Sequence, residues 1–336
     1  MRALAAVVAI IAVSLTSACG AGAPSPRDVA AVGGAVIATV PLRDYGTDVV
    51  VTPDGARVYV ALRAGRVIVV DAGGSHATSE ITVDGQPYAL ALTPGGRRAY
   101  VADFLGEAVS VIDTARGAVT ARIPVGTLKR PSMQPSVAVS RDGLHAYVAD
   151  TSRDHLLAIG TVANQVEKDL FLDIHPSGVG VSPDGHVIYV AGCKLTCTDG
   201  TILVIDAATY AIAARIPLRT APSALAVTPD GRRAYVANGR DASVSAVDLR
   251  TQGVSTIAVG PDPAAIAVDP RGGWVYATSF QAGRLYAIST LTNEVGGTAP
   301  VGAGPRAIAI APDGRRAYVT HSASVLSIVD LARVHP

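Results

Sequence analysis

The chain repeats one pattern of apolar and polar positions. In residues 224–248, a short apolar run leads into the turn Thr-Pro-Asp-Gly at 228–231, and further apolar runs follow at 234–238 and 243–248. Within each run, apolar side chains alternate with small or polar ones, which is typical of β-strands. Proline sets φ at the second turn position, while Asp and Gly supply hydrogen bonds and left-handed backbone. The pattern therefore predicts consecutive β-hairpins.

Seven copies of this pattern follow one another. The second strand of each copy carries a tyrosine, and successive tyrosines are 41 to 47 residues apart. Repeats of roughly 40 to 50 residues with several strands each are typical of propeller blades. No helical apolar period is found beyond the first 20 residues. We therefore predict an all-β fold, a seven-bladed β-propeller of four-stranded blades. The marker tyrosines are Tyr59, Tyr100, Tyr147, Tyr189, Tyr235, Tyr276 and Tyr318.

The two ends of the repeat array are incomplete in complementary ways. The last copy stops after its third strand, at 325–331, and an unassigned strand at 35–42 (AVIATVPL) precedes the first copy. That strand is similar to the fourth strands at 121–125 and 213–218. We predict that strand 35–42 completes the last blade and closes the ring, because an open blade edge would promote aggregation.

Several second strands resemble a known repeat family. The sequences YVAN at 235–238, YVAD at 100–103 and YVT at 318–320 resemble the YVTN β-propeller repeat, and the resemblance extends over about residues 35–331. It implies the propeller fold. Members of that family look like surface-layer, periplasmic and lipid-anchored proteins, and similar propellers include lactonases and binders of ligands or nucleic acid. The resemblance therefore implies no single activity.

The N-terminal segment has the features of an export signal. Arg2 precedes an apolar run at 3–13, which is too short to span a bilayer comfortably. Small residues then lead to Cys19 and resemble a bacterial lipobox, although Thr16 stands where Leu is commonest. We predict that residues 1–18 are a lipoprotein signal peptide and that Cys19 is lipidated. The alternative is an ordinary cleaved signal.

The segment after Cys19 has little apolar surface to bury. Residues 19–34 are rich in Gly, Ala and Pro and are predicted to be a flexible tether, followed by the propeller domain at 35–336. These boundaries predict an exported protein, anchored by lipid to the cell membrane and facing the extracytoplasmic side.

Two insertions interrupt the repeat, at 126–135 and 192–200. Connections from fourth to first strands and from second to third strands emerge on the same propeller face, so both insertions are expected there. Loops on a rigid scaffold often form binding sites. The second insertion holds Cys193 and Cys197, for which we predict a disulfide in an oxidising compartment. We favour this over a metal site because no nearby His completes one.

Polar side chains are concentrated at positions expected on this loop face. They stand at the starts of first strands, after second strands and within the insertions, and they form the predicted binding surface. Hydrogen bonding from blade to blade explains many of them equally well. The predicted binding residues are Asp48, Asp103, Lys129, Arg130, Asp150, Arg153, His155, His175, Lys194, Asn238, Arg240 and His321. Further candidates at first-strand starts are Tyr88, Arg219, Asp262 and Arg306.

Composition narrows the possible functions. The formal net charge is +1, charged residues make up 16% and aromatic residues 4%, so no basic, aromatic-lined groove for nucleic acid is expected. The four Glu residues map to outer strands or to a loop tip, away from the channel. No nucleophile-elbow motif or phosphate-binding loop is present. We expect a binding or scaffold module for a protein or small ligand of the cell envelope, with no catalytic residue and no resident cofactor or metal.

The alternative is a lactonase-like or other metal-dependent hydrolase with an Asp/His site on the loop face. Carboxylates and imidazoles arranged around a channel can bind a divalent cation and polarise a carbonyl. This alternative requires the side chains of Asp48, Asp103, Asp150, His175 and His321 to converge.

Overall fold

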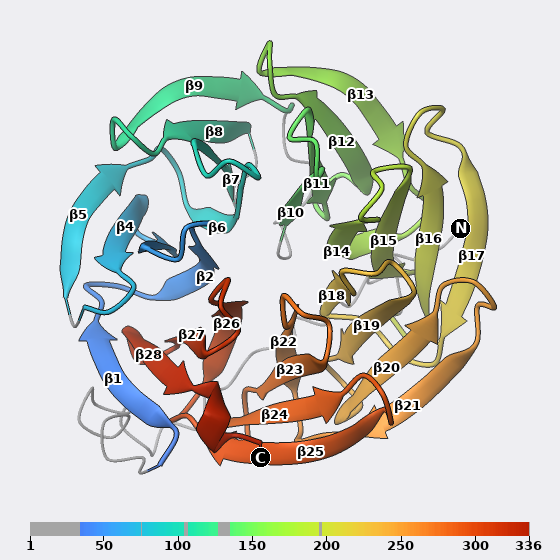
Figure 1. The fold of residues 1–336 in the computed structure, drawn as a ribbon. Helices are drawn as coiled ribbons and strands as arrows, with labels where there is room; N and C mark the ends of the chain where they lie inside the picture. The colour runs from blue at the N-terminus through green and yellow to red at the C-terminus, as the bar shows by residue number, and fades with distance from the viewer. Residues whose placement is uncertain (1–33, 75, 104–106, 127–134, 195–196, 336) are drawn as a thin grey trace, which may run out of the picture.

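The computed structural model shows a closed ring of seven four-stranded sheets around a central channel (Figure 1). It describes residues 34–335 except 75, 104–106, 127–134 and 195–196. The predicted signal peptide, the lipidation site Cys19 and most of the tether lie outside the described residues, as do the predicted binding residues Lys129 and Arg130. The prediction of an all-β, seven-bladed propeller is confirmed.

Each blade is an antiparallel sheet of four strands arranged from the channel to the rim, and in six of the blades the four strands are consecutive in the chain. Pleated, half-buried strands suit the Val, Ile, Ala and Tyr residues of the repeat, because both faces of a blade pack against neighbouring blades. The strands are β1 (Val36–Pro41), β2 (Gly46–Val51), β3 (Arg57–Leu62), β4 (Arg66–Asp71), β5 (Ala77–Thr82), β6 (Pro87–Leu92), β7 (Arg98–Asp103), β8 (Ala108–Asp113), β9 (Ala118–Pro124), β10 (Ser136–Val139), β11 (His145–Asp150), β12 (His155–Gly160), β13 (Gln165–Phe171), β14 (His175–Val181), β15 (Val187–Cys193), β16 (Gly200–Asp206), β17 (Ile212–Leu218), β18 (Ala224–Val227), β19 (Arg233–Asn238), β20 (Ser243–Asp248), β21 (Val254–Ala258), β22 (Pro263–Val268), β23 (Trp274–Ser279), β24 (Arg284–Ser289), β25 (Glu294–Pro300), β26 (Pro305–Ile310), β27 (Arg316–His321) and β28 (Val325–Asp330).

The ring closes as predicted. Strand β1 is the outer strand of the last blade, whose order is β1-β28-β27-β26 (Figure 1). It pairs antiparallel with β28, from Val36 opposite Val329 to Pro41 opposite Val325. The last blade therefore contains the first strand and the last three strands of the chain, and β28 has no unpaired edge. The short 3₁₀ helix η1 (Leu331–Arg333) follows it and is the only helix in the described part of the chain.

The repeated tyrosines join neighbouring blades. Their rings are buried between two sheets, where desolvation raises the pKa of most of the phenols. Several of the hydroxyl groups bond to the next blade: Tyr318 donates to the Ala72 carbonyl at 2.7 Å, and Tyr235 to Asn293 Oδ1 at 2.7 Å. A hydrogen bond satisfies the buried polar end of the ring, so one residue supplies both apolar packing and a specific contact.

We call the two faces of the ring the turn face and the loop face. The turn face holds the connections from first to second and from third to fourth strands, such as β18–β19 and β20–β21. The loop face holds the connections from second to third strands and those that lead from one blade to the next, such as β19–β20 and β21–β22. The two insertions noted in the sequence both fall on loop-face connections, β9–β10 and β15–β16.

Candidate functional site

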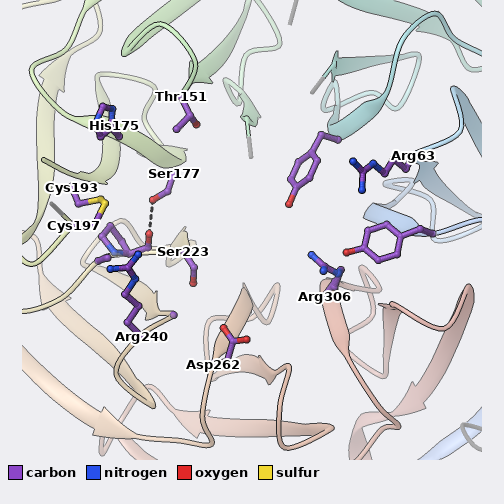
Figure 2. A pocket seen from close by; sticks show the side chains of 15 residues that line it. Arg63, Thr151, His175, Ser177, Cys193, Cys197, Ser223, Arg240, Asp262 and Arg306 are labelled. Carbon is purple, nitrogen blue, oxygen red and sulfur yellow. Dashed lines mark hydrogen bonds between the residues drawn. A yellow bond between two sulfur atoms is a disulfide. The ribbon is translucent and has the colours of Figure 1, made fainter. Parts of the chain in front are cut away.

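A cavity opens at the loop-face end of the central channel. Its volume is about 510 Å³, and its lining residues come from six of the seven blades or from the connections between them. Arg63 and Arg306 stand on one side, while Arg240, Ser177 and Ser223 stand on the other (Figure 2). This volume lies within the range of about 300 to 1,000 Å³ typical of sites for small molecules.

Arg306 is the most unusual side chain of this cavity. It lies near the start of β26, with its guanidinium carbon 4.5 Å from the ring centre of Tyr45 and 5.1 Å from that of Phe280. Its Nε is buried and has no hydrogen-bond partner among the described residues. Desolvation lowers the pKa of Arg306, because burial disfavours the charged form. Cation–π contacts therefore hold a cation whose polar edge is not fully paired within the described structure.

The remaining charged side chains of the cavity do not neutralise Arg306. Arg63 lies after β3 and bonds Gln86 at 3.3 Å, whereas Arg240 lies after β19 and is exposed. Asp262 lies just before β22 in the left-handed region, at φ 54°. Burial raises the pKa of Asp262. Among the described lining residues there are thus three arginines and one carboxylate.

Hydroxyl groups around the cavity mainly tie the blades together. Ser177 Oγ donates to the Pro222 carbonyl at 2.8 Å, and Ser223 Oγ donates to the Pro263 carbonyl at 2.8 Å. Thr151 Oγ1 makes the same kind of bond at 2.6 Å to the carbonyl of Pro176. These bonds link successive blades around the ring, so the wall they form is rigid.

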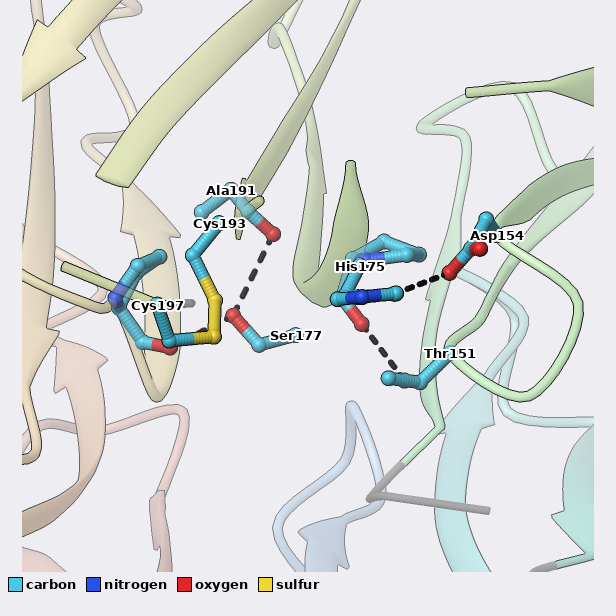
Figure 3. The surroundings of a disulfide bond; sticks show 9 residues. Thr151, Asp154, His175, Ser177, Ala191, Cys193 and Cys197 are labelled. Carbon is cyan, nitrogen blue, oxygen red and sulfur yellow. Dashed lines mark hydrogen bonds and ion pairs between the residues drawn. A yellow bond between two sulfur atoms is a disulfide. The ribbon is translucent and has the colours of Figure 1, made fainter. Parts of the chain in front are cut away.

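The predicted disulfide is present on the cavity wall (Figure 3). The sulfur atoms of Cys193 and Cys197 lie 1.95 Å apart, and the Cα atoms lie 4.9 Å apart. The intervening turn is closed by a hydrogen bond from the Cys197 N–H to the Lys194 carbonyl at 2.7 Å. The bridge holds Cys197 at the channel mouth, near Ser177 (Figure 3).

His175 also faces the cavity. It is the first residue of β14, and its Nδ1 pairs with Asp154 Oδ1 from the β11–β12 connection of the preceding blade (Figure 3). Both side chains are largely buried. The pair connects two blades at the cavity rim, which makes His175 a wall residue held by a neighbouring carboxylate.

Asp48 lies deeper in the channel, in a second cavity of about 310 Å³. Its Oδ1 accepts from the Val49 N–H and its Oδ2 from the Leu90 N–H of the next blade, both at 2.8 Å. The side chain is half-buried, and the surrounding strands reduce the hydration of the carboxyl. Desolvation raises the pKa of Asp48 to about 7, and the two N–H bonds only partly oppose this effect.

Three other predicted binding residues form an ion-pair cluster at the loop-face end of the third blade, which reaches its outer strand β13. Arg153 Nε donates to Asp150 Oδ2 at 2.6 Å, and Arg153 Nη1 lies 3.4 Å from Asp169 Oδ2. His155 Nδ1 also pairs with Asp169. Asp150 further accepts the Ser152 N–H and hydroxyl. The charges of this cluster are thus largely used within one blade.

The remaining predicted residues lie apart from the main cavity. Asp103 Oδ1 accepts the Gln86 N–H at 2.7 Å, and Lys194 is exposed. Asn238 and His321 are buried, at 2% and 0% exposure, and therefore offer almost no surface at the face. Asn238 Nδ2 donates to two serine hydroxyls of its own blade, at 2.9 Å each. Burial lowers the pKa of His321 to about 4, so its ring is neutral near pH 7.

The side chains required by the hydrolase alternative are dispersed. Asp48 lies in the channel, His175 at its mouth and His321 inside the last blade. Across the described ranges, no three His, Cys, Asp or Glu side chains form a group that would hold a metal ion. In the same part of the chain, no helix is long and apolar enough to cross a membrane.

Comparisons with known proteins support the fold. No protein-family model matches the chain, and no curated protein matches it. Among solved structures, a chain of Kuenenia stuttgartiensis hydrazine synthase superposes with a TM-score of 0.77. The two share 20% sequence identity over 86% of this chain and 96% of that chain. At this identity the likeness shows a shared propeller fold.

The sequence identified part of the cavity. His175 and Arg240, both cysteines, and the further candidates Tyr88, Asp262 and Arg306 line it. Other lining or supporting residues were not predicted from the sequence. Ser177 lies within β14, and the others lie on connections without a repeated motif: Tyr45, Arg63, Thr151, Ser223 and Phe280. One signal was available, because aromatic residues are rare in this chain and Tyr45 and Phe280 both fall on loop-face connections.

Proposed function

We propose that this protein is a binding module that takes a small molecule at the loop-face mouth of its channel. The observation that carries the proposal is the cavity of about 510 Å³, whose wall combines apolar surface with arginines and blade-to-blade hydrogen bonds. A rigid concave site with a few polar groups suits a small ligand better than a flat protein surface does.

We further propose that the module works in the cell envelope as a lipid-anchored protein of the YVTN repeat family. The export-signal pattern of residues 1–18 and the position of Cys19 support anchoring. The bridge between Cys193 and Cys197 supports an oxidising compartment, where disulfides persist. Mass spectrometry of the membrane fraction tests this point: a diacylated or triacylated N-terminal Cys19 is expected, and a mature chain beginning elsewhere would contradict it.

The binding proposal is tested with a fragment library and a variant in which the cavity is filled. Ala221 lines the cavity, whereas Ala208 lies exposed on the turn face. We expect fragments found by ligand-observed NMR to bind the full-length chain and Ala208→Trp, and to be lost in Ala221→Trp. Near-identical melting curves of the two variants would establish that both are folded. If Ala221→Trp keeps every fragment, the channel mouth is not the binding site.

A further inference from the structure

We propose that the ligand of this cavity is a small organic anion, whose carboxylate or phosphate is held by Arg306. This inference rests on the proposed function and specifies its ligand class. It is argued from the environment of Arg306, from the balance of charge around the cavity, and from the use already made of the neighbouring hydroxyl groups.

The environment of Arg306 orients a planar cation and leaves donors available. Tyr45, Arg306 and Phe280 come from three successive blades, and the two rings lie 4.5 and 5.1 Å from the guanidinium carbon. A guanidinium that stacks by its face keeps its N–H groups along its edge, where two of them match the two oxygens of a carboxylate or phosphate. Within the described residues, Arg306 has no ion pair, and its Nε is buried without an acceptor.

The described lining of the cavity has a net positive charge. Arg63 stands on the same side as Arg306, and Arg240 projects from the opposite side (Figure 2). Among the described lining residues, Asp262 is the only carboxylate, and no ion pair joins it to Arg306 or Arg240 there; desolvation by burial raises its pKa. An enclosed space with excess positive charge concentrates anions and strengthens the contact once water is excluded.

The neutral polar groups of the cavity favour a charged ligand over a ligand with many hydroxyl groups, such as a sugar. The hydroxyls of Thr151, Ser177 and Ser223 donate to carbonyls of the adjoining blades. Their protons are therefore already used. The charged donors offered to a ligand belong to Arg306 and to the exposed Arg240, whereas other parts of the wall offer proline, alanine and the disulfide to an apolar group. This combination suits an organic acid or phosphate ester with an apolar portion.

The test compares matched anionic and neutral probes by calorimetry on the full-length chain. The pairs are benzoate with benzamide and phenyl phosphate with phenol, so that the two anion classes are separated. We expect at least one anion to bind about tenfold or more tighter than its neutral partner. We also expect its affinity to weaken as the salt concentration rises from about 0.05 M to about 0.5 M.

Three variants localise the effect. Arg306→Gln should weaken binding of the anion about tenfold to a hundredfold, the range for a lost charge-assisted pair of hydrogen bonds. Arg306→Lys should recover only part of that loss, because an ammonium cannot form the planar pair. Arg250→Gln makes the same charge change at an exposed position of the turn face and should bind like the unaltered protein.

The inference fails if anions bind no better than their neutral partners, if no anion binds, or if Arg306→Gln binds as well as the unaltered chain. These outcomes are separable from failure of the proposed function. Neutral fragments that bind the chain and are lost in Ala221→Trp would leave the small-molecule site intact while overturning the anion preference. If neither anionic nor neutral compounds bind the unaltered chain, both the proposed function and the anion preference are wrong.

Discussion

The turn face and the loop face of this ring are built from connections of the same seven blades but differ in regularity. On the turn face, the β18–β19 turn repeats almost unchanged from blade to blade: Thr228 Oγ1 donates to Asp230 Oδ1 at 2.6 Å, and the same contact joins Ser182 to Asp184 at 2.5 Å. On the loop face, the connections vary in length, and the stacked arginine, the disulfide and the His175–Asp154 pair each occur at one place.

This difference separates residues that specify the fold from residues that specify the site. A contact that is repeated in most blades stabilises each of those blades, so it does not identify the position of a single ligand site. The contacts that occur once lie around the cavity, and they are not part of the structure that the blades share. We infer that in such a ring the departures from the repeat, rather than the repeat itself, indicate function.

The largest expected loss of stability comes from removing β1, the strand that closes the ring and so supports both of its faces. Deleting residues 35–42 removes β1, which covers the edge of β28, together with the buried side chains of Ala35, Val40 and Leu42. Losing two or three buried apolar side chains and a strand pairing should cost at least about 5 kcal/mol. Calorimetry should show the melting temperature fall by at least about 10 °C. Deleting residues 21–28, within the predicted tether, is the length-matched control. Equal melting of the two deletions would contradict closure by β1.

The second prediction contrasts carboxyl groups of the channel and of the turn face. The pKa of Asp48 is raised from 3.8 to about 7 in the folded protein, so the folded state holds its proton longer than the unfolded chain. Its stability contribution therefore falls as the pH rises from about 4 to about 7, by at most about 1.4 kcal/mol per pH unit. Asp48→Asn should thus gain stability relative to the unaltered chain between pH 5 and pH 8, measured by urea unfolding.

Asp230 on the turn face should show the opposite sign. The hydrogen bond from Thr228 lowers the pKa of Asp230, so its contribution is present above the unfolded pKa and is lost as the pH falls through the folded pKa. Asp230→Asn should therefore approach the stability of the unaltered chain only in strong acid, below about pH 4. If the stability of the two variants changed with pH in the same direction, the predicted difference between the channel carboxyl and the turn-face carboxyl would be wrong.

A smaller effect is expected for the disulfide on the loop face. Replacing both Cys193 and Cys197 by Ser opens a loop of five residues, and the chain-entropy relation gives a loss of about 2 kcal/mol. Urea unfolding should show this loss, and the unaltered chain in reductant should match the variant. An unchanged midpoint in both experiments would show that the bridge does not stabilise the fold.

The smallest effect separates two glycines of the turn face. Gly231 and Gly185 both have left-handed backbone, at φ +68° and +78°, so an alanine costs about 1 to 2 kcal/mol at either position. A Cβ at Gly231 would also lie 3.0 Å from Pro183 Cδ of the neighbouring blade, whereas one at Gly185 would have nothing within 4 Å. Gly231→Ala should therefore be less stable than Gly185→Ala by roughly 1 kcal/mol in urea unfolding. Equal losses would show that the turns of adjacent blades do not support each other.

The sequence by itself determined the architecture of this protein. Turn chemistry at 228–231 and its copies, the spacing of the tyrosines and the unassigned strand at 35–42 act locally or through simple pairing, so they can be recognised without coordinates. The cysteine pair could be predicted for the same reason, because its members stand only four positions apart in the sequence.

Only the tertiary structure decided which polar residues meet. Asn238 and Arg240 are two residues apart, yet the first is buried within its blade and the second lines the cavity. Tyr45 and Phe280 are 235 residues apart and come together on Arg306, because ring closure brings the first blade beside the last one. Burial and long-range proximity of this kind depend on how seven blades pack together, and no local pattern encodes them.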